Sequence, residues 1–295
     1  MRKSIAIIIT SILVLSGCNK QQSVSDRLLN EVEKAIAINP DSASNLLKSI
    51  SSPEKLDDKA FARWCMLSGK ITDEIFNSIL PTYQLERAYD WYSSHGSPDE
   101  QVQILIYLGR SYFADGDYDK AMSIYTNALD IAGKNKLNNL IGYTYDYIGD
   151  LYREKFMRTE AIKRYEIAAE YFKKEKNTDS YACALRDIGR EYAQMDSLSH
   201  ALNILIIADS VAANTSNINV TASINNALGN IYSMQNKYDK AEEYLLKALL
   251  TGREKMPDYV ALIDLYTASN SINKAKELLS LSLIHISEPT RPEPI

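Results

Sequence analysis

Two arginines and two aspartates occur at the same helical spacing and could carry recognition chemistry. Arg186 and Arg190 are four residues apart, so on a helix they would share one face. Asp146 and Asp150 have the same spacing, forty residues earlier. A guanidinium group binds a carboxylate through paired hydrogen bonds, so the arginines could hold an acidic side chain or chain end of a partner. The alternative, which we favour, is that arginines and aspartates neutralise each other across adjacent helices, at about 0.2 to 1 kcal/mol per exposed pair.

The sequence does not group the residue types that catalysis or metal binding needs. His95 falls in a turn and His200 precedes an expected helix position, and neither has a Cys, His or carboxylate at ligand spacing. Cys65 and Cys183 are more than one hundred residues apart, which favours two separate buried thiols over a disulfide. We therefore expect no enzyme activity, no cofactor and no bound metal.

The composition is that of a folded domain with a small net negative charge. Hydrophobic residues make up 45% of the chain and charged residues 24%, enough to bury a substantial core. The formal net charge is -5, and no basic cluster stands out beyond Lys173 and Lys174. Because nucleic-acid binding depends on many Lys and Arg contacts to phosphates, we expect no nucleic-acid partner.

Five columns of residues recur every 40 positions and indicate four repeats within 99–255. Three columns hold only Gly or Ala, one holds Tyr, and one holds Tyr or Leu. The columns are Gly109, Gly149, Gly189 and Gly229; Tyr112, Tyr152, Tyr192 and Tyr232; Ala121, Ala161, Ala201 and Ala241; Tyr125, Tyr165, Leu205 and Leu245; Ala128, Ala168, Ala208 and Ala248. Small residues let two helices approach closely, and the larger ones fill the neighbouring space. The columns are therefore predicted to be helix contacts.

The pattern of an apolar residue and Gly, then Tyr, then Ala, an aromatic and a further Ala resembles the tetratricopeptide repeat. The resemblance implies an all-α solenoid of antiparallel helix pairs stacked in a right-handed superhelix. The usual period is about 34 residues, so the extra residues are expected to lengthen the helices and their connection. A fifth repeat over 256–280 is truncated and has Ile263 at the Gly position. Residues 25–98 are expected to form degenerate helical repeats, with Asp41 and Asp99 capping helices.

The resemblance also implies where a ligand would bind. In this family the inward face of each first helix lines a concave groove that binds a protein or peptide. The positions carried over to this sequence are Arg110, Phe113, Tyr143, Asp146, Asp150, Arg153, Arg186, Arg190, Asn226 and Asn230.

The N-terminus has the order of an export signal. Arg2 and Lys3 precede an apolar run from Ile5 to Leu15, which is too short to span a membrane as a helix. The residues that follow, up to Cys18, resemble the lipobox of bacterial lipoproteins. We expect residues 1–17 to be a cleaved signal peptide, Cys18 to be lipidated, and 18–24 to be a linker. The lipid would anchor the protein to a membrane of the cell envelope, facing the periplasm.

The C-terminal segment resembles a translated sequencing adaptor. The peptide from Leu281 to Arg291 is the one that a transposase-type adaptor would encode. We therefore interpret residues 281–295 as an artefact, assign no role to His285, and expect the natural protein to continue beyond Ser280.

Three functions remain after this reading. The first is an envelope-anchored scaffold that binds a protein or peptide, similar to repeat lipoproteins of Bacteroidetes. The second is the input half of a membrane-associated sensory or transcriptional regulator whose effector part is missing. The third is a glycan-uptake lipoprotein, which we rank last because Trp64 and Trp91 are expected within helices rather than on long exposed loops.

Overall fold

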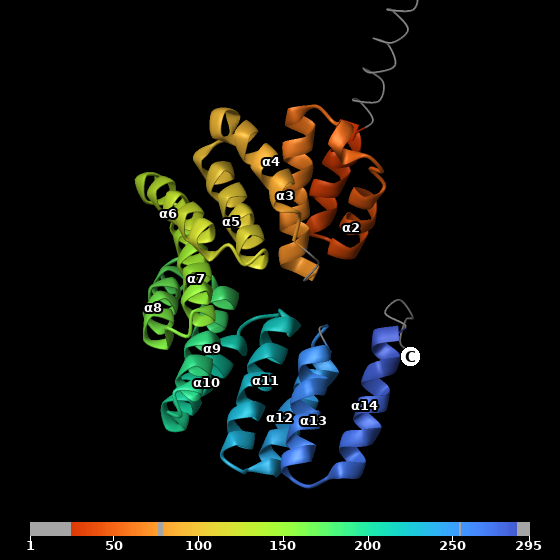
Figure 1. Cartoon of the computed structure of the whole chain (residues 1–295), viewed down its shortest axis with the longest axis vertical. Helices are drawn as coiled ribbons and strands as arrows, with labels where there is room; N and C mark the ends of the chain where they lie inside the picture. The colour runs from red at the N-terminus through yellow and green to blue at the C-terminus, as the bar shows by residue number, and fades with distance from the viewer. Residues whose placement is uncertain (1–24, 76–78, 254, 288–295) are drawn as a thin grey trace, which may run out of the picture. The chain divides into compact units, whose positions relative to one another are not determined.

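The computed structural model describes residues 25–75, 79–253 and 255–287, and these residues form helices joined by short turns (Figure 1). They fall into two compact units that divide at Leu140 and Ile141. The expected signal peptide, Cys18 and residues 288–295 of the tail lie outside the described residues. Within the described part, every helix is too short or too polar to serve as a membrane span.

The first unit, residues 1–140, contains a helix at 25–36 followed by further α-helices, each of which packs against the next α-helix, and one short 3-10 helix. In order they are α2 (Pro40–Lys48), the short 3-10 helix η1 (Pro53–Lys55), α3 (Asp58–Ile75), α4 (Thr82–His95), α5 (Pro98–Ala114) and α6 (Tyr118–Asn135). The core of this unit includes a buried cluster around Leu29 and Leu67 and another around Phe61 and Leu85.

Two helix caps in this unit differ from the predicted ones. The side chain of Asn39, not Asp41, accepts the backbone N–H of Ser42 and begins α2. Ser97, not Asp99, caps α5 in a reciprocal box with Glu100. In both cases a proline follows the cap. Proline suits the first helical position because its missing N–H would have had no intrahelical partner there, so the capping residue must be the one before it.

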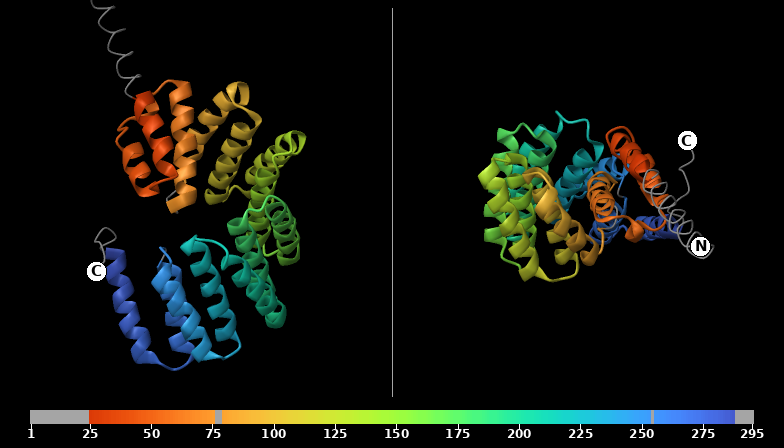
Figure 2. Two further views of the ribbon diagram at one scale, coloured as in Figure 1. Left: turned by 180° about the vertical axis from the view of Figure 1, so that it is seen from behind. Right: turned by 90° about the horizontal axis from the view of Figure 1, so that it is seen from above.

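The second unit, residues 141–295, begins inside a helix and continues as stacked helix pairs. Its helices are α7 (Asn138–Glu154), α8 (Arg158–Lys174), α9 (Thr178–Gln194), α10 (Leu198–Ala212), α11 (Ile218–Met234), α12 (Tyr238–Thr251), α13 (Met256–Ala268) and α14 (Ile272–Ser287). Besides packing against its chain neighbours, α11 contacts both α9 and α13 (Figures 1 and 2). These first helices of successive pairs thus form one layer. The helix α14 includes residues 281–287 of the tail.

The recurring small residues lie where a first helix meets the second helix of its own pair. A side-chain carbon added to Gly149 would lie 2.5 Å from the ring of Tyr165, and one added to Gly189 would lie 2.8 Å from Leu205 Cγ. The alanines of both columns are fully buried in every repeat. Interiors pack as densely as organic crystals, so these positions leave no room for even one extra carbon. The fold is an all-α solenoid of antiparallel helix pairs.

The turns inside the pairs share one backbone feature. The second residue after each of α5, α7, α9 and α11 is left-handed. These residues are Gly116, Phe156, Asp196 and Asn236, each forty positions after the one before. Gly and Asn suit this conformation, whereas a bulky residue such as Phe is strained in it. The connections between consecutive helices from α6 to α11 are two to five residues long, whereas α7, α8 and α9 each have 17 residues. The extra length of the repeat therefore lies in the helices. Our expectation that the connections would also be longer is wrong.

Candidate functional site

Six charged side chains on two first helices of the second unit lie within electrostatic reach of one another. We call them the charged cluster: Asp146, Asp150 and Arg153 of α7, with Arg186, Asp187 and Arg190 of α9. Five were expected from the sequence to face a ligand. Asp187 was not, because it occupies none of the groove positions carried over from the family, and no signal in the sequence singled it out.

Asp187 organises the α9 half of the cluster. It is 5% exposed and accepts two hydrogen bonds from Arg186, Nη2 to Oδ2 at 2.7 Å and Nε to Oδ1 at 3.0 Å. Burial by itself would raise the pKa of Asp187, but the charge and hydrogen bonds of Arg186 outweigh it and hold that pKa below its ordinary value. Asp187 is therefore ionised at neutral pH.

Arg186 links α9 to the next first helix. Its Nη1 donates to Ser223 Oγ of α11 at 2.9 Å and contacts Cys183 Sγ at 3.6 Å, while its other two nitrogens bind Asp187. Its side chain is 18% exposed. A guanidinium engaged on all of its nitrogens has little left for a ligand, so Arg186 is a structural residue of this face.

Arg190 is engaged far less. Its side chain is 42% exposed, and its contact within the cluster is a single 3.5 Å hydrogen bond from Nη1 to Asp187 Oδ1. At that length the bond is weak, and the opposite edge of the guanidinium is left for other acceptors. Of the two arginines that could have bound a carboxylate, the structure leaves Arg190 available.

On α7, Asp150 and Arg153 pair with each other. Arg153 Nη1 lies 2.8 Å from Asp150 Oδ1, which also accepts the hydroxyl of Tyr165 at 2.8 Å. Our expectation that the arginines of α9 pair with Asp146 and Asp150 is thus wrong. In the charged cluster, each aspartate that forms an ion pair does so with an arginine of its own helix. Asp187 pairs with Arg186, one residue away, and Asp150 pairs with Arg153, three residues away.

Asp146 differs from the rest of the cluster. Its Oδ1 is buried and has no hydrogen-bond partner, although the residue as a whole is half-buried. Burial raises the pKa of this carboxyl well above its ordinary value, the charges of Asp150 and Asp187 raise it further, and Arg186 and Arg153 oppose the shift. A buried polar atom without a partner costs about 1 to 3 kcal/mol, so this position is unfavourable in the isolated protein.

The expected asparagines continue the polar face toward α13. Asn226 Nδ2 donates to Asp258 Oδ1 at 2.7 Å, and Asn230 Nδ2 donates to Asn226 Oδ1 at 3.0 Å. Tyr143 is used differently, because its hydroxyl accepts hydrogen bonds from Asn177 at 3.1 Å and Ser180 at 2.9 Å. Tyr143 therefore joins two repeats. Asn230 is half-buried on the polar face.

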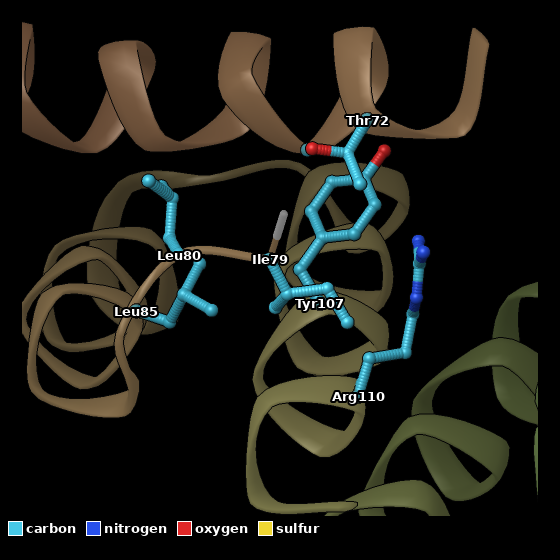
Figure 3. Close-up of a pocket in the computed structure, with 7 residues that line it drawn as sticks. Thr72, Ile79, Leu80, Leu85, Tyr107 and Arg110 are labelled. Atoms are coloured by element: carbon cyan, nitrogen blue, oxygen red, sulfur yellow. The ribbon is translucent and has the colours of Figure 1, made fainter. Parts of the chain in front are cut away.

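The two expected groove residues of the first unit lie in α5 and are described within that unit. Arg110 forms an ion pair with Asp73, which also accepts the hydroxyl of Tyr107 at 3.0 Å. Arg110 and Tyr107 line a small pocket of about 10 Å³ with Gly69, Thr72, Ile79, Leu80 and Leu85 (Figure 3). This volume holds about one water molecule, so the pocket is too small for a ligand. The ring of Phe113 packs against the ring of Tyr118, with the ring centroids 5.5 Å apart.

The remaining reactive side chains are not grouped. Within the described ranges, no three His, Cys, Asp or Glu residues are arranged to hold a metal ion. His95 stacks on Trp91 and His200 on Tyr192. Cys65 is buried, which raises the pKa of its thiol to about 12. Such a thiol is a poor nucleophile at neutral pH.

Comparison with known protein families finds tetratricopeptide repeats in both units. Residues 105–138 and 221–256 each match a tetratricopeptide repeat model. The chain is also 32% identical over 91 residues to the photosystem I assembly protein Ycf3 of Rippkaea orientalis, a match that covers 30% of this chain and 52% of that protein. The chain thus spans about half the length of this curated relative.

Solved structures with a similar fold are helical repeat proteins. A Rap protein, crystallised in complex with Competence and Sporulation Factor, matches with a TM-score of 0.72 at 19% identity, covering 88% of this chain and 76% of that one. The quorum sensor NprR of B. thuringiensis, in its apo form, matches with a TM-score of 0.56 at 15% identity, covering 92% and 78%. BtubC of P. vanneervenii matches with a TM-score of 0.59 at 18% identity, covering 72% and 93%. At these identities the similarity shows the fold alone.

Proposed function

We propose that this chain is a protein-binding scaffold of the cell envelope, held to a membrane by a lipid on Cys18. The bound partner is a peptide or an extended segment of a protein, and it lies along the polar row formed by the charged cluster, Asn226 and Asn230 on the first helices of the second unit. The observation that carries the proposal is Arg190. Its charged head is partly exposed, and within the cluster it makes one hydrogen bond, 3.5 Å long, to Asp187.

The chemistry of this row suits a polar backbone or side chain. Arg190 offers a guanidinium edge to a carboxylate or carbonyl, and Asn230 is a half-buried amide that both donates and accepts. Both sit on helices, which hold them in fixed positions, so a ligand would not have to order them. A catalytic role finds no support here, because the row contains no nucleophile beside a general base.

Site-specific photo-crosslinking in the native envelope tests this function. A photoreactive phenylalanine analogue replaces Asn230 in the polar row or, as a matched control, the exposed Glu166 of α8. We expect a discrete crosslinked protein from position 230 that is absent from position 166 and reduced by Arg190→Ala. Equal crosslinking from both positions, or none from position 230 in a folded variant, would contradict the proposal.

The lipid anchor has its own test. Replacing Cys18 by Ser should abolish labelling with a radioactive fatty acid and release the protein from the membrane fraction, because anchoring depends on the buried hydrocarbon of the lipid chains. Retention of the Cys18→Ser variant in membranes would show that another element holds it there.

The similarity to Rap and to the quorum sensor NprR favours one second candidate, the input half of a sensory regulator. In that case the polar row would bind a signal and a further domain would respond to it. The two candidates differ in the gene: a DNA-binding module, or an apolar run of about 20 residues encoded beyond this sequence, would favour the regulator. Glycan uptake has no such support, since Trp64 and Trp91 lie half-buried within α3 and α4.

A further inference from the structure

We propose that Asp146 is a binding site for a cation, namely a lysine or arginine side chain of the bound segment. This inference rests on the proposed function, because it names one chemical feature of the partner that lies on the same polar row. It starts from the carboxyl group itself, which makes no ion pair or hydrogen bond within the described part of the chain, with Oδ1 buried and unpartnered. Its other oxygen, also without a hydrogen bond, is open to solvent, because the residue is half-buried.

The other two aspartates of the charged cluster show what Asp146 lacks. Asp187 accepts hydrogen bonds from two arginines. Asp150 forms an ion pair with Arg153 and accepts a hydrogen bond from the hydroxyl of Tyr165. The donors of the cluster are thus directed at Asp150, Asp187, Tyr165 and Ser223, and none of them reaches Asp146. Buried polar groups in proteins normally have a hydrogen-bond partner, and Asp146 is the aspartate of the cluster that lacks one. A hydrogen-bond donor on a bound partner is therefore most strongly favoured at Asp146.

The surroundings select a positive donor over a neutral one. Charged and titratable groups face Asp146 from its own helix and from α9; they are Asp150, Arg153, Cys183, Arg186 and Asp187. The aspartates raise the pKa of Asp146, and the arginines, whose donors are directed at other acceptors, only partly oppose them. An incoming cation relieves both the burial of the negative charge and its repulsion by the two neighbouring carboxylates. A neutral donor relieves neither repulsion.

A lysine or arginine side chain fits this site better than a free metal ion. One open carboxylate oxygen cannot supply the several ligands that a metal requires, and no three metal-ligating side chains are grouped in the described residues. A long basic side chain can instead place its charged head at Asp146 while its backbone follows the polar row. With Arg190 on the same row, the preferred segment carries a basic residue close to an acidic group.

Peptide titration followed by NMR tests the site. The probes are acetyl-Gly-Gly-Lys-Gly-Gly-amide and the same peptide with norleucine in place of lysine, added to the whole protein with the Asp146 carboxyl carbon observed directly. We expect the lysine peptide, and not the norleucine peptide, to shift this signal and to lower the pKa of Asp146. The protonated acid must lose its proton to pair with a cation, so lysine affinity should rise as the pH rises through that pKa.

The matched variants are Asp146→Asn and, as a control, Glu166→Gln on the exposed side of α8. A charge-assisted hydrogen bond contributes about 1.5 to 3 kcal/mol, so Asp146→Asn should weaken lysine-peptide binding at least tenfold and Glu166→Gln should leave it unchanged. At a pH above the pKa of Asp146, Asp146→Asn should also raise the melting temperature, because it removes a negative charge that burial and the neighbouring carboxylates disfavour. A raised melting temperature would show that the loss of binding is not a loss of folding.

The outcomes separate the inference from the proposed function. Equal binding of both peptides, unchanged lysine binding in Asp146→Asn, or no response of the Asp146 signal to the lysine peptide would each overturn the cation site. If the crosslink from position 230 persists at full strength in Asp146→Asn, the row still binds a partner and only the cation site is wrong. Loss of that crosslink in Asp146→Asn, with the lysine preference, supports both.

Discussion

Replacing Gly109 by Ala should destabilise the first unit, even though alanine is the better helix former. Alanine gains about 1 kcal/mol over glycine inside a helix. At this position, however, the new carbon would lie 2.2 Å from Cε1 of Tyr125, whose side chain is 1% exposed. Neither the ring nor the helix can move without disturbing the core, and overpacking of this kind costs about 1 to 3 kcal/mol. Because the approach is so close we take the upper end, which leaves a net loss of about 2 kcal/mol.

The matched control is Gly133→Ala in the same unit. Gly133 lies near the end of α6, and an added carbon there meets nothing within 4 Å. This variant should gain about 0.5 kcal/mol, part of the full propensity difference. For a chain of this size, 1 kcal/mol shifts the melting temperature by about 2 to 4 °C. Melting followed by circular dichroism should therefore show Gly109→Ala about 4 to 8 °C lower than the natural protein and Gly133→Ala slightly higher.

Hydrogen exchange locates the effect. In a repeat protein each helix pair contacts only its neighbours, so the loss of protection in Gly109→Ala should be centred on α5 and α6 and should decline with distance along the stack. A Gly109→Ala variant that melts at or above the natural temperature would refute the reasoning, because the glycine column would then not be a site of close helix contact.

Further predictions concern a strained turn, a buried ion pair and a buried thiol. Phe156→Gly should raise the unfolding free energy by about 1 kcal/mol, measured by denaturant titration, because the 79% exposed Phe loses little packing and its left-handed strain is relieved. Glu191→Gln should lower the melting temperature, because it weakens the 3.0 Å pair between Arg158 and the 2% exposed Glu191 by about 1.5 to 3 kcal/mol. Glu243→Gln, at an exposed pair, should leave the melting temperature nearly unchanged. Cys65 should resist thiol reagents at pH 8 in the folded protein and react after denaturation, as peptide mapping would show; its pKa is raised from 9.0 to about 12, so the stability it contributes is present below pH 9 and is lost as the pH rises toward 12.

The helix pairs follow from local features of the sequence. A Gly or Ala recurring in fixed phase with Tyr or Leu is a statement about contacts within one pair, and the partners Gly149 and Tyr165 are only sixteen residues apart. Short-range packing of this kind is encoded in residue size and spacing, so the all-α repeat architecture could be predicted. Each cap was misplaced by two positions, because both Asn39 and Asp41, and both Ser97 and Asp99, have the chemistry of a cap, and only the backbone distinguishes them.

The electrostatic arrangement of the polar row was decided by the tertiary structure. The sequence placed two arginines and two aspartates on facing helices, but it could not show that Asp187 would bind Arg186 and leave Asp146 without a donor. Ion pairing depends on rotamers and on distances of an ångström or less between side chains of several helices, and helical phase does not determine these. What the sequence determined by itself is therefore the repeat and its packing, which depend on size. Which charged groups remain available to a partner depends on competition among neighbours, and that competition is resolved only in the folded protein.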